Sequence, residues 1–257
     1  MKASISWIPV WMPVLPNKLP LTVGVLGGMG PDATVDFMSK VIAATPAGSD
    51  QEHVHMLVDH NPHVPDRTRA ILGEGGEPGP VLAAMAKQLE QAGASMIVMP
   101  CNTAHAFQAD IEAALDVPFV SIIDETVEAC RGNSAVGLLA TRGCLVSDIY
   151  QTALGAVGIE TIVPDEDEVA ELASLIATIK MGDFSPAVGA SMKQLAEGLT
   201  SRGAQAVIAG CTEIPLVLDQ SMLDAPLISS TDILADATVA YALGKQDLDN
   251  RPKGSAA

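Results

Sequence analysis

Short apolar runs alternate with longer amphipathic segments along most of the chain. The runs are continuously apolar, as in SMIVM at 95–99, which is typical of parallel strands buried on both faces. They lie at residues 21–27, 53–59, 95–100, 117–122, 134–140, 159–164, 204–210 and 225–229. Helical spacing occupies residues 81–93, 103–115, 166–180, 186–202 and 230–244. This alternation predicts an α/β fold with mainly parallel sheets.

The same pattern occurs twice. TVGVLGGMGP (22–31) is similar to AVGLLATRG (135–143), and MIVMPCNTAH (96–105) is similar to AVIAGCTEIP (206–215). The two halves therefore predict two similar Rossmann-like lobes, each with a cysteine just after a strand. Because ligands of open α/β sheets bind beyond the carboxyl ends of the strands, we expect Cys101 and Cys211 to face one cleft between the lobes.

Composition and charge exclude several classes of partner. The chain has 257 residues, 48 % of them hydrophobic, and carries 31 acidic against 14 basic residues, a formal net charge of -17. Such a field disfavours nucleic acid and anionic membrane surfaces. The apolar stretch at 1–20 is broken by four prolines, and no run is long enough to span a membrane. We expect a soluble, cytoplasmic protein.

Metal and nucleotide sites are not indicated. The four cysteines show no CxxC pairing, so neither zinc nor a disulfide scaffold is expected. His53, His55, His60 and His63 cluster, but no cysteine or acidic triad completes a ligand set, and we expect a structural or rim role for them. The GVLGGMG segment departs from G-x-G-x-x-G, which argues against a dinucleotide. We interpret Gly27, Gly28 and Gly30 as allowing close backbone approach to a substrate.

Two thiols at strand-to-helix transitions suggest acid–base chemistry. The positive end of a following helix is expected to lower a thiol pKa and favour thiolate at Cys101 and Cys211. A thiolate on one face of a bound carbon acid can remove a proton while a thiol on the other face delivers one. The outcome is inversion of a stereocentre without a cofactor. Cys130 and Cys144 lack this context and are expected to pack in the core.

Four motifs in order resemble one family. PCNTAH (100–105), GCTEIP (210–215), GVLGGMGP (24–31) and NPHVPDRT (61–68) together resemble the aspartate/glutamate racemases, the pyridoxal-phosphate-independent enzymes with two catalytic cysteines. The resemblance runs from about residue 21 to residue 244. It implies lobes related by pseudo-twofold symmetry, no cofactor, a homodimer, and Cys101 and Cys211 as the proton donor and acceptor pair. It also implies that Cys211 deprotonates the L-enantiomer and Cys101 the D-enantiomer.

The same resemblance suggests domain boundaries. Residues 21–118 form the first lobe, to which a C-terminal helix at 230–244 returns, and residues 119–229 form the second. Residues 1–20 are expected to be a disordered extension. Residues 245–257, polar and containing proline and glycine, are expected to be a flexible tail.

Substrate-binding residues follow from the motifs. The resemblance implies that Arg67 and Lys180 hold substrate carboxylates, with Arg69 as a nearby alternative. Side chains and N–H groups beside the cysteines suit the α-carboxylate and α-ammonium of an amino acid, and Met29 is placed near the pocket. The residues beside the cysteines are Asn102, Thr103, Ala104, Thr212 and Glu213, of which the two threonines are also possible helix N-caps. Glu213 stands where glutamate racemases usually carry histidine, which favours aspartate.

Three alternatives remain open. A hydantoin racemase would handle largely neutral substrates, which do not need two cations such as Arg67 and Lys180 for binding. A malonate decarboxylase needs only one protonating cysteine. A non-catalytic amino-acid-binding protein on the same scaffold would bind without turnover and have thiols of ordinary pKa.

Overall fold

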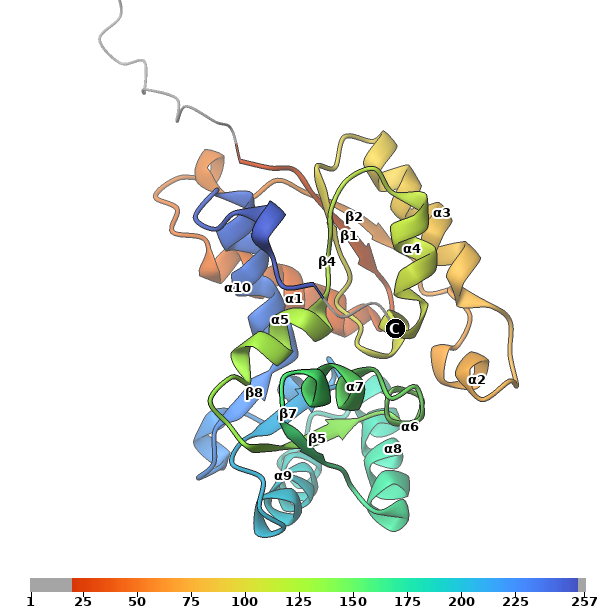
Figure 1. Cartoon of the computed structure of the whole chain (residues 1–257), viewed down its shortest axis with the longest axis vertical. Coiled ribbons are helices and arrows are strands. Elements are labelled where there is room, and N and C mark those ends of the chain that lie inside the picture. Colours follow the sequence, from red (N-terminus) through yellow and green to blue (C-terminus); the bar gives the residue numbers. More distant parts are fainter. Residues whose placement is uncertain (1–19, 254–257) are drawn as a thin grey trace, which may run out of the picture.

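Two parallel sheets of four strands form the framework of the protein (Figure 1). The computed structural model describes residues 20–253. The extension expected at 1–20 therefore lies, apart from its last residue, outside the described residues. Among the described helices none is long and apolar enough to cross a membrane.

The sheets repeat one strand order. The first contains β1 (Val23–Gly27), β2 (Met56–His60), β3 (Met96–Val98) and β4 (Phe119–Val120) in the order β2-β1-β3-β4. The second contains β5 (Ala135–Ala140), β6 (Glu160–Ile162), β7 (Val207–Gly210) and β8 (Leu227–Ser229) in the order β6-β5-β7-β8. All neighbouring strands are parallel. The predicted α/β fold with two similar lobes is confirmed, and each predicted strand is present.

Helices follow the strands in both lobes. Those up to the lobe junction are α1 (Pro31–Ala44), α2 (Arg67–Ile71), α3 (Pro78–Gln91), α4 (Gln108–Ala114) and α5 (Ile122–Ala129). The later ones are α6 (Arg142–Val146), α7 (Ile149–Ala156), α8 (Glu166–Lys180), α9 (Pro186–Ser201) and α10 (Ser230–Ala242). Short 3-10 turns are η1 (Asp50–Glu52), η2 (Thr103–Phe107), η3 (Ile214–Leu216), η4 (Gln220–Met222) and η5 (Leu248–Asn250).

Local sequence explains where key helices begin. Asp165 and Glu168 form a reciprocal capping box that starts α8, whose last residue is Lys180. Ser229 caps α10 by accepting a hydrogen bond from the backbone of Asp232. The helix predicted at 103–115 is instead split into η2 and α4, so each cysteine is followed by a 3-10 turn rather than by a regular α-helix.

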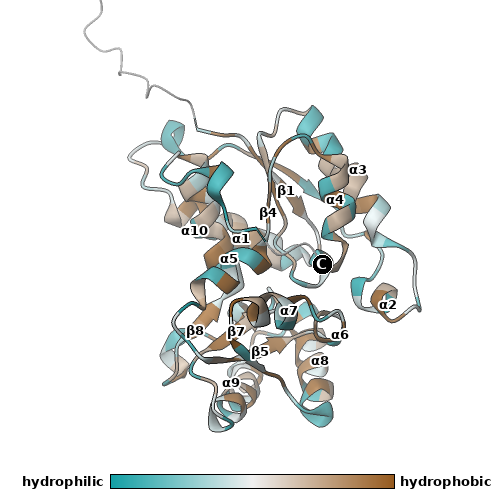
Figure 2. Ribbon diagram, viewed as in Figure 1, coloured by the Kyte–Doolittle hydropathy of each residue, from teal (hydrophilic) through white to brown (hydrophobic). Residues whose placement is uncertain are grey.

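The two lobes share one hydrophobic cluster. Along β1, Val23 and Val25 face this shared cluster, whereas Leu26 faces a separate cluster under α3. In the second sheet Val136 and Leu138 face the shared cluster. Helix α10 contacts both α1 and α5, and α5 contacts α7, so these helices fill the space between the sheets (Figures 1 and 2). Close packing across the junction therefore fixes how the lobes lie relative to each other.

The described part of the C-terminal segment is held against the first lobe. The guanidinium of Arg251 donates to the carbonyl of Phe119 at 3.0 Å and to that of Leu248 at 3.1 Å. One arginine thus satisfies two carbonyls, and the flexibility expected for 245–257 stays a prediction. Residues 254–257 lie outside the described residues.

Candidate active site

Two cysteines from different lobes line one pocket. Cys101 follows β3 and Cys211 follows β7, and the two thiols are 6 % and 5 % exposed. The first lobe contributes Met29, Asp66, Arg67, Thr68, Cys101, Asn102 and Thr103, and the second contributes Thr141, Lys180, Cys211, Thr212 and Glu213. Of the residues expected to bind the amino acid beside the cysteines, Ala104 does not line this pocket, because it is fully buried in the core under α3.

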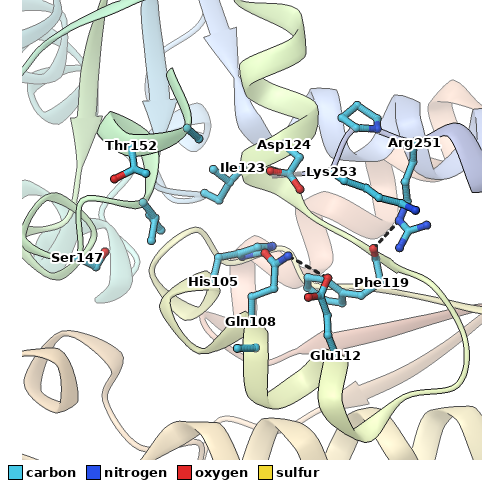
Figure 3. Close-up of a pocket in the computed structure, with 14 residues that line it drawn as sticks. His105, Gln108, Glu112, Phe119, Ile123, Asp124, Ser147, Thr152, Arg251 and Lys253 are labelled. Carbon is cyan, nitrogen blue, oxygen red and sulfur yellow. Dashed lines mark hydrogen bonds between the residues drawn. The ribbon is translucent and has the colours of Figure 1, made fainter. Parts of the chain in front are cut away.

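The pocket between the thiols is nearly closed. Its free volume is about 30 Å³, enough for about two water molecules, since one needs at least about 10–15 Å³. An amino acid is larger, so its entry requires side chains or lobes to move apart. A larger cavity of about 470 Å³ lies on the other side of η2, between α4, α5 and α7 (Figure 3). It is lined by His105 but by neither thiol, so it cannot host chemistry between them.

Glu213 links the second-lobe thiol to a lysine. The thiol of Cys211 donates to Oε2 of Glu213 at 2.9 Å, and Nζ of Lys180 lies 3.5 Å from Oε1. Oε1 is buried and accepts no hydrogen bond. A Cβ added at Gly30 would lie 3.1 Å from Oε1, so a glycine here leaves room for the carboxylate. The structure thus assigns Gly30 to contact with Glu213, and Gly28, at φ +92°, to close contact with the backbone of Asn61.

Both thiols resist ionisation in the closed pocket. Burial raises the pKa of the Cys101 thiol, and the nearby Arg67 guanidinium opposes this only in part. Burial also raises the pKa of Cys211, and the carboxylate of Glu213 raises it further. The expectation that these positions favour thiolate is therefore wrong for this closed state. Loss of water around the thiols is the largest influence on both, and the residues that follow each cysteine first form a 3-10 turn rather than an α-helix.

Arg67 presents an unused donor. Its Nη1 donates to the carbonyls of Val64 and Pro65, both at 3.2 Å, and its Nε is buried without a hydrogen-bond partner. The alternative, Arg69, is exposed, donates to the carbonyl of Glu74 and does not line the pocket. Arg67 is therefore the arginine that the fold aims at the thiols.

The polar residues after the cysteines bind other parts of the chain. The amide of Asn102 contacts Tyr150 and Ser230, and the hydroxyl of Thr103 lies 2.7 Å from that of Thr141. The hydroxyl of Thr212 donates to Glu213 at 3.4 Å. Neither Thr103 nor Thr212 is an N-cap, since Asn102 and Glu213 occupy those positions without side-chain capping bonds.

Some pocket residues were not expected from the sequence. Asp66 and Thr68 flank Arg67 within a recognised motif, and Thr141 matches Gly28 when the two halves are aligned, so the repeat could have indicated it. Tyr150 has no motif around it. Its contact with Asn102 joins residues 48 positions apart, which only the fold reveals.

His105 and the other two cysteines are buried away from the pocket. His105 is buried, its Nδ1 lies 2.8 Å from the carbonyl of Cys101, and its Nε2 accepts from the backbone of Ile122. Burial lowers its pKa to about 4, so it is neutral at pH 7. Cys130 and Cys144 lie in the shared cluster, where burial raises the pKa of each to about 12. Within residues 20–253 no group of three His, Cys, Asp or Glu could hold a metal ion.

Comparisons with known proteins agree with this geometry. The broad-specificity amino-acid racemase RacX of Bacillus subtilis (strain 168) is 33 % identical over 229 residues, which cover 87 % of this chain and 99 % of RacX. Picrophilus torridus aspartate racemase has a TM-score of 0.78 and 30 % identity over 86 % of this chain and 94 % of its own. An aspartate racemase homologue from Pyrococcus horikoshii OT3 has a TM-score of 0.71 and 27 % identity, over 86 % and 99 % of the two chains.

A family model matches most of the chain. The model of the Asp/Glu/hydantoin racemases matches residues 26–238, which include both cysteine turns, the pocket between them and both sheets except the first residues of β1. The chain belongs to the Asp/Glu/hydantoin racemase family.

Proposed function

We propose that this member of the racemase family inverts the α-carbon of aspartate by proton transfer between two thiols. One observation carries the proposal: Cys101 and Cys211 reach the same pocket from equivalent strands of opposite lobes. A planar carbanion between two thiols can be protonated from either face, which is what racemisation requires. Its relatives are named racemases, and the enzyme class is accordingly that of an isomerase.

Two cations are available to hold the substrate. The partnerless Nε of Arg67 suits a carboxylate, because a guanidinium can donate two parallel hydrogen bonds. Lys180 supplies a point charge on the second lobe, although it shares that charge with Glu213. In a chain of net charge -17 a dianionic substrate depends on such local cations. We assign one carboxylate of aspartate to Arg67 and the other to Lys180.

Glu213 is the group that activates Cys211. In the proposed first step its Oε2, already the acceptor of the thiol hydrogen bond, takes the proton of Cys211. The resulting thiolate removes the α-proton of the L-enantiomer. The thiol of Cys101 then delivers its proton to the opposite face and is left as thiolate. For the D-enantiomer the same transfers run in reverse, so each proton that leaves one group is accepted by another.

Neutral amino acids are the second candidate substrates. Because Glu213 lies 3.5 Å from Lys180, the second cation is already partly neutralised before substrate binds. This arrangement would tolerate an uncharged side chain, and one relative is named for broad specificity. A substrate panel separates the two candidates.

The test is racemisation measured by chiral chromatography with the purified protein and no added cofactor. The panel contains L-aspartate, L-glutamate, L-alanine, L-lysine and a 5-substituted hydantoin. We expect D-aspartate to form with the highest kcat/KM. Faster turnover of L-alanine or L-lysine would favour the second candidate. Absence of racemisation with every compound would overturn the proposal.

A further inference from the structure

We infer that Tyr150 and Ser230 are positioning residues that hold the Cys101 turn at a fixed distance from the Cys211 strand, through the side-chain amide of Asn102. The inference rests on the proposed two-thiol function. Neither residue lines the pocket, so neither is expected to contact the substrate.

Three buried hydrogen bonds form a chain between the lobes. The hydroxyl of Tyr150 donates to Oδ1 of Asn102 at 2.6 Å, and Nδ2 of Asn102 donates to Oγ of Ser230 at 3.0 Å. Oγ of Ser230 in turn donates to the carbonyl of Ala209 at 2.7 Å. Asn102 immediately follows Cys101 in the first lobe, whereas Ala209 lies in β7, two residues before Cys211.

The elements that carry these groups come from across the fold. Tyr150 lies on α7 of the second lobe, and Ser230 is the first residue of α10, which packs on α1 of the first lobe. Two hydrogen bonds are thus enough to connect Asn102 to β7. In Figure 1, α7 lies at the edge of the second lobe that faces the first, and α10 rises beside α1 and α5.

Each donor in this series of hydrogen bonds has a single acceptor. Ser230 uses its proton on Ala209, so it can only accept from Asn102, and this fixes which way the amide faces. Tyr150 must then donate to Oδ1. Burial raises the pKa of Tyr150 well above its ordinary value, so it stays a donor across the working pH range. All three side chains are buried, where a fully satisfied polar network is strong and directional.

Directionality matters because racemisation is sensitive to distance. Apolar packing of the shared cluster holds the lobes together but is non-directional, whereas hydrogen bonds also fix the orientation of the Cys101 turn. Reacting atoms must approach within about 3–3.5 Å, and a displacement of about 1 Å can cost about 100-fold in rate. A series of hydrogen bonds that begins beside Cys101 and ends beside Cys211 can keep the two thiols at the distance that proton transfer requires.

The test compares two matched tyrosine variants. Tyr150→Phe removes only the hydroxyl that contacts Asn102. Tyr241→Phe is the control, because that buried hydroxyl donates to Glu125 on α5 at 2.8 Å and Tyr241 does not line the pocket. Each enzyme is incubated with L-aspartate in D2O, and deuterium at Cα is measured separately in the recovered L-aspartate and in the D-aspartate formed.

We expect Tyr150→Phe to lower kcat by about 10-fold or more with KM within about twofold. Slower delivery from Cys101 should prolong the carbanion, which gives the Cys211 thiol more time to exchange the abstracted proton with D2O before it returns a hydrogen to the same face. Deuterium in L-aspartate should therefore rise relative to D-aspartate formed. Tyr241→Phe should keep the wild-type ratio, since a loss of stability alone lowers exchange and inversion equally.

A second variant protects the test against misfolding. Ser230→Ala breaks the chain at its middle and should raise the same ratio. An unchanged ratio in whichever of Tyr150→Phe and Ser230→Ala is folded would overturn the positioning role. Failure of the wild-type enzyme to racemise any substrate would instead defeat the proposed function, so the two failures are distinguishable.

Discussion

Glu213 is the residue on which the proton transfers depend most. Its carboxylate is 4 % exposed, accepts from the Cys211 thiol and faces Lys180. We predict that Glu213→Gln lowers kcat for L-aspartate by about 100-fold or more, because an amide keeps the shape but cannot accept the thiol proton. Steady-state racemisation is the measurement. Glu112→Gln, an exposed change on α4, is the control, and equal activity of the two variants would contradict this role.

His105 makes stability depend on pH on the acid side. Its pKa is near 4 in the folded chain and 6.5 in the unfolded one, so below pH 6.5 the unfolded state binds the extra proton first. The contribution of neutral His105 to the free energy of unfolding is complete above pH 6.5 and is lost as the pH falls towards 4. The free energy of unfolding of the wild-type protein should decrease between pH 7 and pH 4.5. Urea unfolding at these two pH values should show that His105→Gln removes up to about 3 kcal/mol of this decrease. The same fall in both proteins would show that His105 is not its source.

At the residue scale the sequence predicted which residues line the pocket better than it predicted whether the thiols are ionised. Cys101, Cys211, Arg67 and Lys180 were found through motifs, and all four line the pocket. The ionisation of the thiols was predicted wrongly, because burial depends on what covers a side chain in three dimensions. The partners of Asn102 could not be predicted either, since nothing in the sequence near Tyr150 marks it.

Helix α6 brings the second lobe against the first beside the pocket. A Cβ added at Gly143 would lie 2.8 Å from Cα of Thr68 and 3.1 Å from the methyl group of Thr103. We predict that Gly143→Ala pushes α6 away from α2 and lowers kcat/KM by about 10-fold. Gly155→Ala on α7, where the added atom meets open space, is the matched control.

The control should retain activity and gain about 0.5–1 kcal/mol of unfolding free energy, because alanine replaces glycine inside a helix. Kinetics and urea unfolding of both variants check the pair. Wild-type kcat/KM in Gly143→Ala would show that the approach of α6 to α2 does not control the site.

At the element scale the strands were predictable and the turns after the cysteines were not. Continuous apolar runs identified each strand, although the runs extend beyond the hydrogen-bonded residues, as at 117–122 around β4. The 103–115 segment has helical spacing, yet its first five residues form a 3-10 turn. That turn fits the bonds of Asn102 and His105 to distant residues, which spacing cannot encode.

At the scale of the whole molecule, duplication explains the site. Repeating the strand order places equivalent strand ends, and so both cysteines, on either side of one pocket. The duplication was legible because paired motifs recur at similar spacing. The contacts that hold the two lobes together could not be predicted from the sequence. The shared cluster and the hydrogen bonds of Asn102 join residues that are far apart in the sequence.

The two-thiol claim is tested most directly by following Cα hydrogen during a single conversion of L-aspartate in D2O. The account predicts that D-aspartate formed early carries deuterium at Cα while the remaining L-aspartate stays largely protiated, because separate groups remove and deliver the proton. Cys101→Ser and Cys211→Ser should each abolish racemisation. D-aspartate that retains the original protium, or undiminished racemisation in either serine variant, would contradict the account.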